Sequence, residues 1–361
     1  MRDEADKRYM RMALDLALQG AGRASPNPLV GAVLVRGGRV VAAGHHRRAG
    51  GDHAEIVALK RAGKKARGAT LYVNLEPCSH YGRTPPCTLS VIEAGVETVI
   101  AGMADPNPLV SGLGVRALRK AGIHVRLGIL REESRRLNEA FTKYITRRVP
   151  FVTLKLAASL DGKIAAATGH SRWITGPESR RYVHELRNRV DAVLVGVGTI
   201  VADNPQLTCR IPRGRNPIRI VLDSGLRMPL SSQVLHERGK TIVVAGARVP
   251  IRKVRAIEKL GAEVWRLPTR DGAVPFASIL RAMGNSQIVS VMIEGGAVTA
   301  GRALSEQVVD KICFFYAPRI IGGDGLDMIA PIGVTQMRQA KQLKNLEVEK
   351  LGEDFLVTGY L

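Results

Sequence analysis

The sequence predicts an α/β protein with two domains, and three observations support this. Strand-like and helix-like segments alternate along the chain, which favours layered α/β architecture. The chain has 361 residues, enough for two ordinary domains, and 45% of them are apolar. The alternation is interrupted by a charged stretch at residues 130–148 and then restarts after Pro150. We therefore expect one domain at residues 1–147 and a second at residues 148–361.

The first half begins with a helix and a β-hairpin. Apolar residues recur at helical spacing over residues 4–19, and Gly20 supplies a stop. Gly37 and Gly38 lie between two apolar strands and are typical of a hairpin turn. Helices and strands alternate afterwards, which predicts largely parallel strands. The expected strands are 31–36, 39–44, 70–75, 97–101 and 123–127, and the expected helices are 54–62, 88–94 and 115–120.

The charged stretch at residues 130–148 predicts one helix that leads to the domain boundary. In the second half, Pro177 opens a helix over residues 177–189, because its missing N–H costs nothing in a first turn. Residues 309–316 and 355–361 are expected to be late, antiparallel additions to the sheet. The other expected strands are 151–157, 191–197, 218–223, 241–245, 263–267 and 288–293, and residues 297–304 are expected to be helical.

The composition limits the classes of partner. The net charge is +22, which fits a solvated basic surface, small phosphorylated ligands or nucleic acid, in that order. Nucleic acid comes third because aromatic residues are only 4%, whereas single-strand binders interleave aromatics with charge. No apolar run approaches the roughly 18 residues of a membrane span. The charged N-terminus is not typical of a signal peptide, so we expect a cytoplasmic protein.

Four residues have the types that a zinc-dependent deaminase requires. Such enzymes hold zinc with one His and two Cys, and a nearby Glu that is not a ligand moves protons. Here His53 and Glu55 lie at a helix start, Cys78 follows a strand, and Cys87 opens a helix whose N-terminus favours a thiolate. The cysteines are nine positions apart instead of the usual three. Two unrelated cysteines near a chance His-x-Glu are the alternative interpretation.

Longer motifs occur along nearly the whole chain. They are SPNPLVGAVLV, AGGDHAEIVAL, LEPCSHYGRTPPC, DPNP, LKLAASLDGKIA, SRWIT, VGTIVADNPQLT, IRIVLDS and IEGGAVTAGRAL. With these motifs the sequence resembles the bifunctional riboflavin-biosynthesis deaminase–reductases, and the long Cys–Cys segment is that family's variant. The resemblance implies a cytidine-deaminase-like three-layer α/β/α domain followed by a dihydrofolate-reductase-like domain.

The resemblance implies two consecutive reactions. The first domain would hydrolyse the 2-amino group of 2,5-diamino-6-ribosylamino-4(3H)-pyrimidinone 5′-phosphate with zinc. The second would use NADPH to reduce the ribosyl group, giving 5-amino-6-ribitylamino-uracil 5′-phosphate. The family also suggests a homo-oligomer, a dimer or a tetramer.

Residue roles follow from the same resemblance. His53, Cys78 and Cys87 match zinc ligands, and Glu55 matches the catalytic proton shuttle. Positions for the deaminase substrate are Asn27, His46, His80, Arg83, Asp105 and Asn107. Positions near the reductase substrate are Ser171, Arg187, Leu207, Arg210 and Glu294, and cofactor positions are Ala157, Trp173, Thr199, Asp203, Ser224, Gly295 and Gly296.

Without the resemblance, the reductase signal is weak. Residues 196–199 lack the third glycine of a dinucleotide fingerprint. Gly295 and Gly296 precede a helix whose amides could bind a phosphate, although a packing turn is the alternative. Arg187 and Arg210 could grip a sugar phosphate through their guanidinium forks, or Arg187 could belong to a solvated basic face. Trp173 fits either the core or a cover over the nicotinamide.

Two other functions compete with the two-step enzyme. The charge motivates a deaminase that edits a flipped base in tRNA or single-stranded DNA, with the second half as a binding module. The low aromatic content and the motifs of the second half oppose it. In the other alternative one domain is degenerate, and the reductase is the more plausible one because the four deaminase core residues are present.

Overall fold

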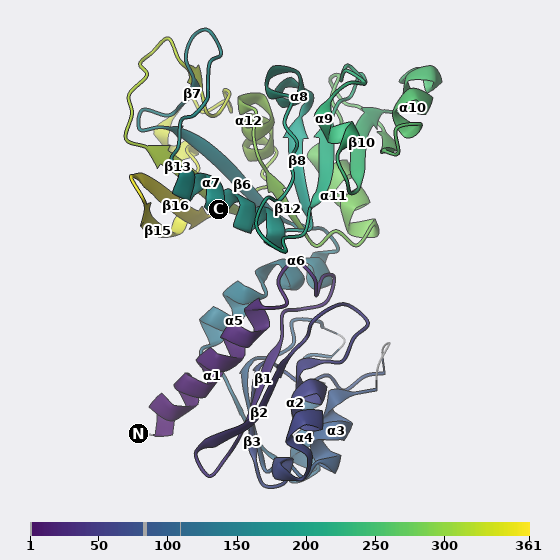
Figure 1. The fold of residues 1–361 in the computed structure, drawn as a ribbon, viewed down its shortest axis with the longest axis vertical. Helices are drawn as coiled ribbons and strands as arrows, with labels where there is room; N and C mark the ends of the chain where they lie inside the picture. The colour runs from purple at the N-terminus through teal and green to yellow at the C-terminus, as the bar shows by residue number, and fades with distance from the viewer. Residues whose placement is uncertain (1, 82–84, 109) are drawn as a thin grey trace. The chain divides into compact units, whose positions relative to one another are not determined.

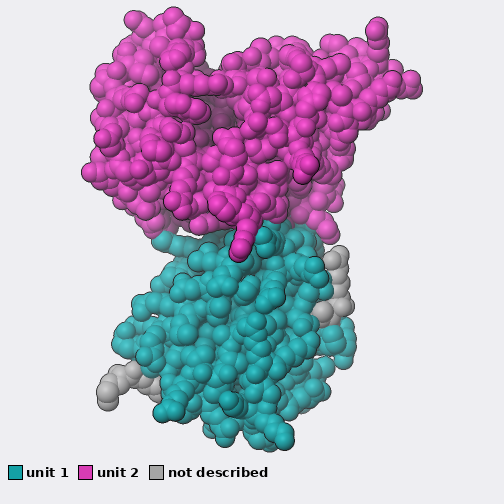
Figure 2. Space-filling view, in the orientation of Figure 1, with its two compact units in different colours: residues 1–148 teal, residues 149–361 magenta. Residues whose placement is uncertain are grey.

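The computed structural model describes residues 2–81, 85–108 and 110–361 (Figure 1). The chain divides into two compact units, Met1–Arg148 and Val149–Leu361 (Figure 2). Each unit has its own sheet and its own hydrophobic core, and the predicted α/β fold class is confirmed. Among the described residues, we find no helix with the length and apolar character of a membrane span.

A five-stranded sheet organises unit 1. Its strand order is β2-β1-β3-β4-β5, in which β1 is antiparallel to both neighbours and the later strands are parallel. The predicted hairpin and parallel segment are therefore confirmed. The strands are β1 (Gly31–Arg36), β2 (Arg39–His45), β3 (Thr70–Leu75), β4 (Thr98–Met103) and β5 (His124–Leu127).

Helices cover both faces of this sheet and make three layers (Figure 1). Helices α1 and α5 lie on one face, where Met10 and Ala13 of α1 are fully buried. Gly31 permits the close approach of α1, because a Cβ there would lie 2.0 Å from the carbonyl oxygen of Ala13. Helices α2, α3 and α4 cover the other face. The bounds are α1 (Arg2–Leu18), α2 (Ala54–Ala62), α3 (Cys87–Glu93), α4 (Leu113–Lys120) and α5 (Arg131–Leu137), with the 3₁₀ turn η1 (Gly63–Ala66) after α2.

The prediction of one charged helix over residues 130–148 is wrong. The stretch forms two helices, α5 and α6 (Glu139–Arg147), which meet at Asn138. The Asn138 side chain accepts a hydrogen bond from the Leu29 N–H at 2.8 Å and donates to the Leu29 carbonyl at 3.0 Å. This tertiary pairing, with an Asn138 φ of −108°, competes with helix continuation.

Unit 2 is built on a nine-stranded sheet. Its strand order is β11-β10-β9-β8-β12-β6-β13-β16-β15, and all neighbours from β11 to β13 are parallel. The strands are β6 (Phe151–Ser159), β8 (Ala192–Gly196), β9 (Ile218–Leu222), β10 (Thr241–Gly246), β11 (Glu263–Leu267), β12 (Ser290–Ile293), β13 (Lys311–Ala317), β15 (Lys344–Leu351) and β16 (Asp354–Tyr360), with a separate pair β7 (Lys163–Ala165) and β14 (Leu326–Asp327).

The expectation that residues 309–316 form an antiparallel addition is half wrong. Strand β13 is antiparallel to β16 but parallel to β6. The reason is that α12 (Ala297–Ser305) connects β12 to β13 as a crossover, which returns the chain in the same direction. Residues 355–361 do give an antiparallel strand, β16, and β15 beside it was not predicted.

Side chains alternate between the two faces of this sheet and bury two cores. Leu194, Ile220 and Ile242 pack on one face with residues of α11 (Phe276–Asn285) and α12. Val195, Val221 and Val243 pack on the other face with residues of α8 (Val197–Asp203), α9 (Gln233–His236) and α10 (Ile251–Glu258). Helix α7 (Pro177–Arg189) covers β13 and β16 on that second face. Parallel strands bring their carboxyl ends to one edge, where α/β sheets place ligand sites.

Candidate functional site

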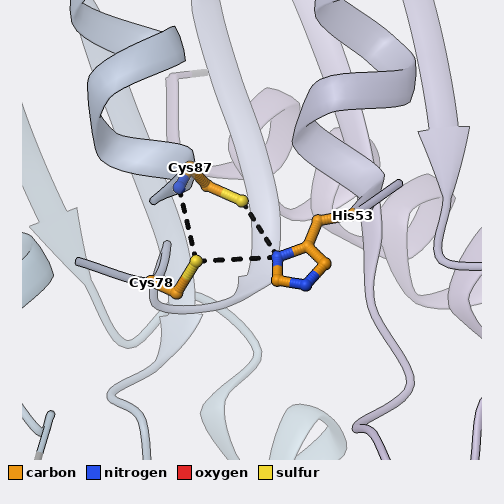
Figure 3. A group of neighbouring side chains, drawn as sticks. All are labelled: His53, Cys78 and Cys87. Carbon is orange, nitrogen blue, oxygen red and sulfur yellow. Dashed lines mark hydrogen bonds between the residues drawn. The ribbon is translucent and has the colours of Figure 1, made fainter. Parts of the chain in front are cut away.

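Three elements of unit 1 bring His53, Cys78 and Cys87 together (Figure 3). His53 is the N-cap of α2, Cys78 lies just beyond β3, and Cys87 is the first residue of α3. His53 Nδ1 lies 3.1 Å from Cys87 Sγ and 3.6 Å from Cys78 Sγ. The three potential ligand atoms all lie within 4.8 Å of one another. One imidazole and two thiolates are a zinc donor set, and three protein ligands leave the fourth position of a catalytic zinc open.

The two sulfur atoms are electrostatically unequal. The Cys87 thiol and the Cys87 N–H (3.3 Å) both donate to Cys78 Sγ, which lowers the pKa of Cys78 to about 4. The same hydrogen bond and burial raise the pKa of Cys87, so they outweigh the helix N-terminus that was expected to favour a thiolate there. The hydrogen bond with Cys78 raises the pKa of His53. The hydrogen bonds from Cys87 therefore favour the thiolate form at Cys78.

Glu55 lies in the first turn of α2, beside the three potential ligands. Its side chain is buried, and burial, followed by the charge of Cys78, raises its pKa to about 7. A carboxyl group with a pKa near neutrality can both accept and return a proton. The arrangement therefore has a metal-ligand set and a separate proton carrier, as hydrolytic deamination requires.

Asn27 and His46, which were predicted to contact substrate, contact each other. Asn27 Nδ2 lies 3.0 Å from His46 Nε2, and His46 Nδ1 lies 3.0 Å from the Asp52 carbonyl oxygen. Burial lowers the pKa of His46, so the ring is neutral, with Nδ1–H donating to Asp52 and Nε2 accepting from Asn27. The His46 ring stands edge-on to His53, with 5.5 Å between centroids. These two residues therefore border the zinc site.

Asp105 and Asn107 lie on the loop after β4. The Asn107 N–H donates to Asp105 Oδ1 at 2.8 Å, and burial raises the pKa of Asp105. His80 is exposed and lies two residues after Cys78. The predicted substrate residue Arg83 lies outside the described residues.

Three buried polar residues that the sequence reasoning missed hold the loops of this site. Asn74, at the end of β3, accepts from the Gly31 N–H and donates to the Leu29 carbonyl, both at 2.8 Å. Asn138 holds Leu29 from the other side, and Glu76 holds the loop after β4. The signal that could have found Asn74 and Glu76 is the presence of two polar side chains where the buried strand β3 ends, shortly before Cys78.

In unit 2 the predicted cofactor positions gather at the carboxyl edge of the parallel strands. Ala157 is near the end of β6, and Ser224 follows β9. Thr199 and Asp203 are on α8, which follows β8 directly. Gly295 and Gly296 follow β12 with φ angles of 112° and 53°, and a Cβ on Gly296 would lie 3.1 Å from Thr199 Oγ1. Residues that are distant in sequence thus meet at one edge.

Arg187 and Glu294 form a buried ion pair. Arg187 Nε and Nη2 donate to the two carboxylate oxygens at 2.6 and 2.7 Å, and Nη1 donates to the Thr208 carbonyl at 2.9 Å. The side chains are 12% and 6% exposed, so Arg187 does not belong to a solvated basic face. Its fork is already occupied by Glu294, which leaves the phosphate contact to other groups. Lys155, which was not predicted, neighbours this pair; burial lowers its pKa, and Glu294 opposes that shift.

Trp173 is 61% exposed, which excludes the core interpretation. The guanidinium carbon of Arg180 lies 4.7 Å from the centroid of its ring. Arg319 donates to the Trp173 carbonyl at 3.0 Å, and Arg172 donates to the Asp203 carbonyl at 2.9 Å. These arginines hold the segment that carries Trp173, whose side chain is exposed.

The remaining predicted substrate positions of unit 2 differ in exposure. The Leu207 side chain is buried in the core, so its backbone is the part that can face a ligand. Arg210 is exposed and donates to Gln206 Oε1 at 3.0 Å. Ser171 is half-buried on the segment before Trp173.

Comparisons with known families match both units. Residues 3–103 match the cytidine and deoxycytidylate deaminase zinc-binding region. Residues 150–357 match the RibD C-terminal domain. The two matches separate the chain into a zinc-dependent deaminase part and an NADPH-dependent reductase part, in agreement with the cluster of His53, Cys78 and Cys87.

Individual relatives match the chain from end to end. The riboflavin biosynthesis protein RibD of Aquifex aeolicus is 45% identical over 98% of this chain and 98% of its own length. The solved structure of Acinetobacter baumannii RibD superposes with a TM-score of 0.90 at 35% identity and covers 99% of both chains. A Thermotoga maritima diaminohydroxyphosphoribosylaminopyrimidine deaminase/5-amino-6-(5-phosphoribosylamino)uracil reductase superposes with a TM-score of 0.88 at 41% identity, covering 100% of this chain and 99% of that one. The chain therefore belongs to the RibD family of bifunctional riboflavin-biosynthesis enzymes, which join a zinc-dependent deaminase to an NADPH-dependent reductase.

Proposed function

We propose that residues 1–147 deaminate 2,5-diamino-6-ribosylamino-4(3H)-pyrimidinone 5′-phosphate and that residues 148–361 reduce the ribosyl group of the product. The observation that carries the first assignment is the His53, Cys78 and Cys87 cluster beside buried Glu55. The observation that supports the second is the gathering of the predicted cofactor positions at one sheet edge.

In the deaminase site, His53, Cys78 and Cys87 hold zinc, which supplies activation of water at neutral pH. Glu55 takes one proton from the attacking water and delivers it to the ring nitrogen, and it then carries the second proton of that water to the leaving amine. Water oxygen bonds to C2 of the pyrimidine, the C2–N bond breaks, and ammonia leaves. The neutral His46, Asn27, Asp105 and Asn107 orient the substrate through hydrogen bonds.

In the reductase site, the backbone at Gly295 and Gly296 and the start of α12 receive a cofactor phosphate. Trp173 would cover the nicotinamide. NADPH would supply hydride to C1′ of the opened sugar, and Glu294 and Arg187 would lie near that carbon. Ala157, Thr199, Asp203 and Ser224 complete the cofactor contacts, and Ser171 and the Leu207 backbone contact the substrate.

Arg210 is the proposed contact for the sugar phosphate. Arg210 is exposed, whereas the fork of Arg187 is occupied by Glu294. Arg210→Ala should raise the KM for the deaminated substrate about tenfold, as expected for one charge-assisted hydrogen bond, and leave the NADPH KM unchanged. An unchanged substrate KM would remove Arg210 from the phosphate site.

A homo-oligomer in the cytoplasm is proposed as the working form. The edge strand β15 exposes Leu346 and Val348, and Phe355 of β16 is also exposed. Exposed apolar edge strands invite pairing with another chain. Val348→Lys should shift the sedimentation profile toward monomer if this edge is the interface. Two zinc thiolates also suit a reducing compartment.

The test of the whole proposal is mass spectrometry of the diaminopyrimidine phosphate incubated with zinc-loaded enzyme. Deaminated product without NADPH, and deaminated plus reduced product with NADPH, is the expected result. Deamination alone would refute the reductase assignment. No conversion in either reaction would refute both assignments and would favour a nucleic-acid substrate instead. The full-length match to RibD proteins does not favour that alternative.

A further inference from the structure

Glu76 is a buried carboxylate whose oxygen atoms all face backbone N–H groups. Its side chain is 4% exposed. Oε2 accepts from the N–H groups of Asp105 and Gly112, and Oε1 accepts from the N–H of Val115, each at 3.0 Å. The Glu76 N–H also donates to the Met103 carbonyl at 2.9 Å, which extends the β3–β4 ladder by one bond. The main chain and the side chain of Glu76 therefore both bind the region where β4 ends and the next loop begins.

These hydrogen bonds join the segment that carries Cys78 to the segment that carries Asp105. Glu76 is followed by Pro77 and the zinc-ligand candidate Cys78. The groups that it binds are Asp105, which lies just beyond β4, and Gly112 and Val115 at the start of α4. Gly114 adds a close contact, because a Cβ there would lie only 2.1 Å from the Pro77 carbonyl oxygen.

We propose that Glu76 is a positioning residue of the deaminase, which sets the place of the substrate loop at Asp105 and Asn107 relative to the zinc ligands. This inference rests on the proposed substrate roles of Asp105 and Asn107. Glu76 contacts neither metal nor substrate in this role. It acts through the loop, whose Asp105 N–H it binds directly.

A carboxylate is the side chain that this position requires. Three N–H donors converge on two oxygens, and an ionised carboxylate is an acceptor only. Two of the donors belong to the start of α4, Gly112 at its N-cap and Val115 in its first turn, where the helix dipole also favours negative charge. Glutamine would present an NH₂ group to at least one of these donors. Aspartate would keep the charge but fall one methylene short.

The experiment compares Glu76→Gln with Glu93→Gln in the full-length, zinc-loaded enzyme. Glu93 is an exposed residue of α3, so its substitution removes a similar charge without touching the loop. For Glu76→Gln we expect kcat/KM of deamination to fall about 10- to 100-fold, as for other residues that orient a site indirectly. Most of the loss should be in KM, zinc should stay at the wild-type ratio, and reduction of the deaminated substrate should be unchanged. Glu93→Gln should match the wild type.

Three results would overturn the proposal. These are an unchanged KM, a loss confined to kcat, and a fall in zinc content that accounts for the lost activity. If Glu76→Gln does not fold, the same measurements are made on Glu76→Asp. A partial rise in its KM with zinc retained would support the positioning role. Wild-type kinetics of Glu76→Asp would refute that role. Failure of the wild type and of Glu93→Gln to deaminate the substrate would instead refute the proposed function.

Discussion

The zinc cluster of unit 1 and the ligand edge of unit 2 are organised in opposite ways. In unit 1, three potential ligand atoms lie within 4.8 Å, and Asn74, Glu76 and Asn138 hold the surrounding loops through buried hydrogen bonds. In unit 2, Trp173 and Arg210 are exposed, and the Arg187–Glu294 pair is the part locked in place. In the first site buried hydrogen bonds hold the loops around the potential ligand atoms, whereas in the second site Trp173 and Arg210 are exposed.

The difference follows from what each site must bind. A metal ion of fixed coordination tolerates little error in donor position, so its ligands come from the ends of rigid elements. A dinucleotide and a sugar phosphate are large and must enter and leave at each turnover. Exposed aromatic and guanidinium groups such as Trp173 and Arg210 are accessible to ligands of this size. Four substitutions test this difference between the two sites.

Cys87→Ser should have the largest effect. Loss of one thiolate from a three-ligand set should release zinc and reduce deamination by a factor on the order of 1000 or more, because no nucleophilic water is generated at neutral pH. Reduction of deaminated substrate should persist, since Cys87 belongs to unit 1. Zinc analysis and the two separate assays measure this. Retained zinc with full deamination would remove Cys87 from the site.

Glu55→Gln should abolish proton transfer without disturbing the metal. We expect deamination to fall by a factor of about 100 to 10,000, the usual contribution of a positioned acid–base group. Zinc content should equal that of the wild type, because Glu55 lies outside the three-ligand cluster. If zinc is lost together with activity, Glu55 is structural.

Arg187→Met alone should destabilise unit 2 by about 3–5 kcal/mol, because it leaves the buried Glu294 carboxylate without its partner. The double variant Arg187→Met/Glu294→Leu should recover much of that stability in chemical denaturation and still fail to reduce the substrate. Recovery of both stability and reduction would make the pair purely structural, and the contrast between the two sites would then weaken.

Arg180→Ala should have the smallest effect. Removal of a cation–π contact at an exposed ring costs about 0.5–1 kcal/mol, so NADPH affinity should fall about two- to fivefold. Trp265→Phe leaves Trp173 as the single tryptophan, so quenching of its fluorescence by NADPH can be titrated directly. Arg181→Ala, on the next residue of α7, is the matched control and should bind NADPH like the wild type. Equal affinity in both variants would mean that Arg180 does not position the indole.

The two sites also differed in how far sequence could predict them. Zinc chemistry restricts ligands to a few residue types, so the grouping of His53, Cys78 and Cys87 could be inferred from residue type and from the elements on which they lie. The pairing of Arg187 with Glu294 could not be inferred from the sequence, because it joins residues that are 107 positions apart and because arginine is common on exposed helices. Its partner became visible only when β12 and α7 were placed in the fold.

Strands were predicted more successfully than their directions. The apolar run at residues 309–316 identified β13, but its parallel pairing with β6 depends on the crossover through α12. The break between α5 and α6 was missed because the decisive interaction of Asn138 is with Leu29, which is 109 positions away. The local sequence pattern can identify a helix or a strand. Which other elements it contacts depends on the fold of the whole unit.

Different elements hold the two cysteines, and this affects which changes in chain length between them the family can accept. Cys78 is fixed by the end of β3, Cys87 by the start of α3, and the Thr88 N–H joins them by donating to the Cys78 carbonyl at 3.2 Å. Neither ligand position depends on the length of chain between them, and lengthening a loop costs little free energy. The interval between the cysteines is therefore a place where evolution can insert or delete residues without losing the metal. A spacing of nine and a spacing of three are then two solutions to the same coordination problem.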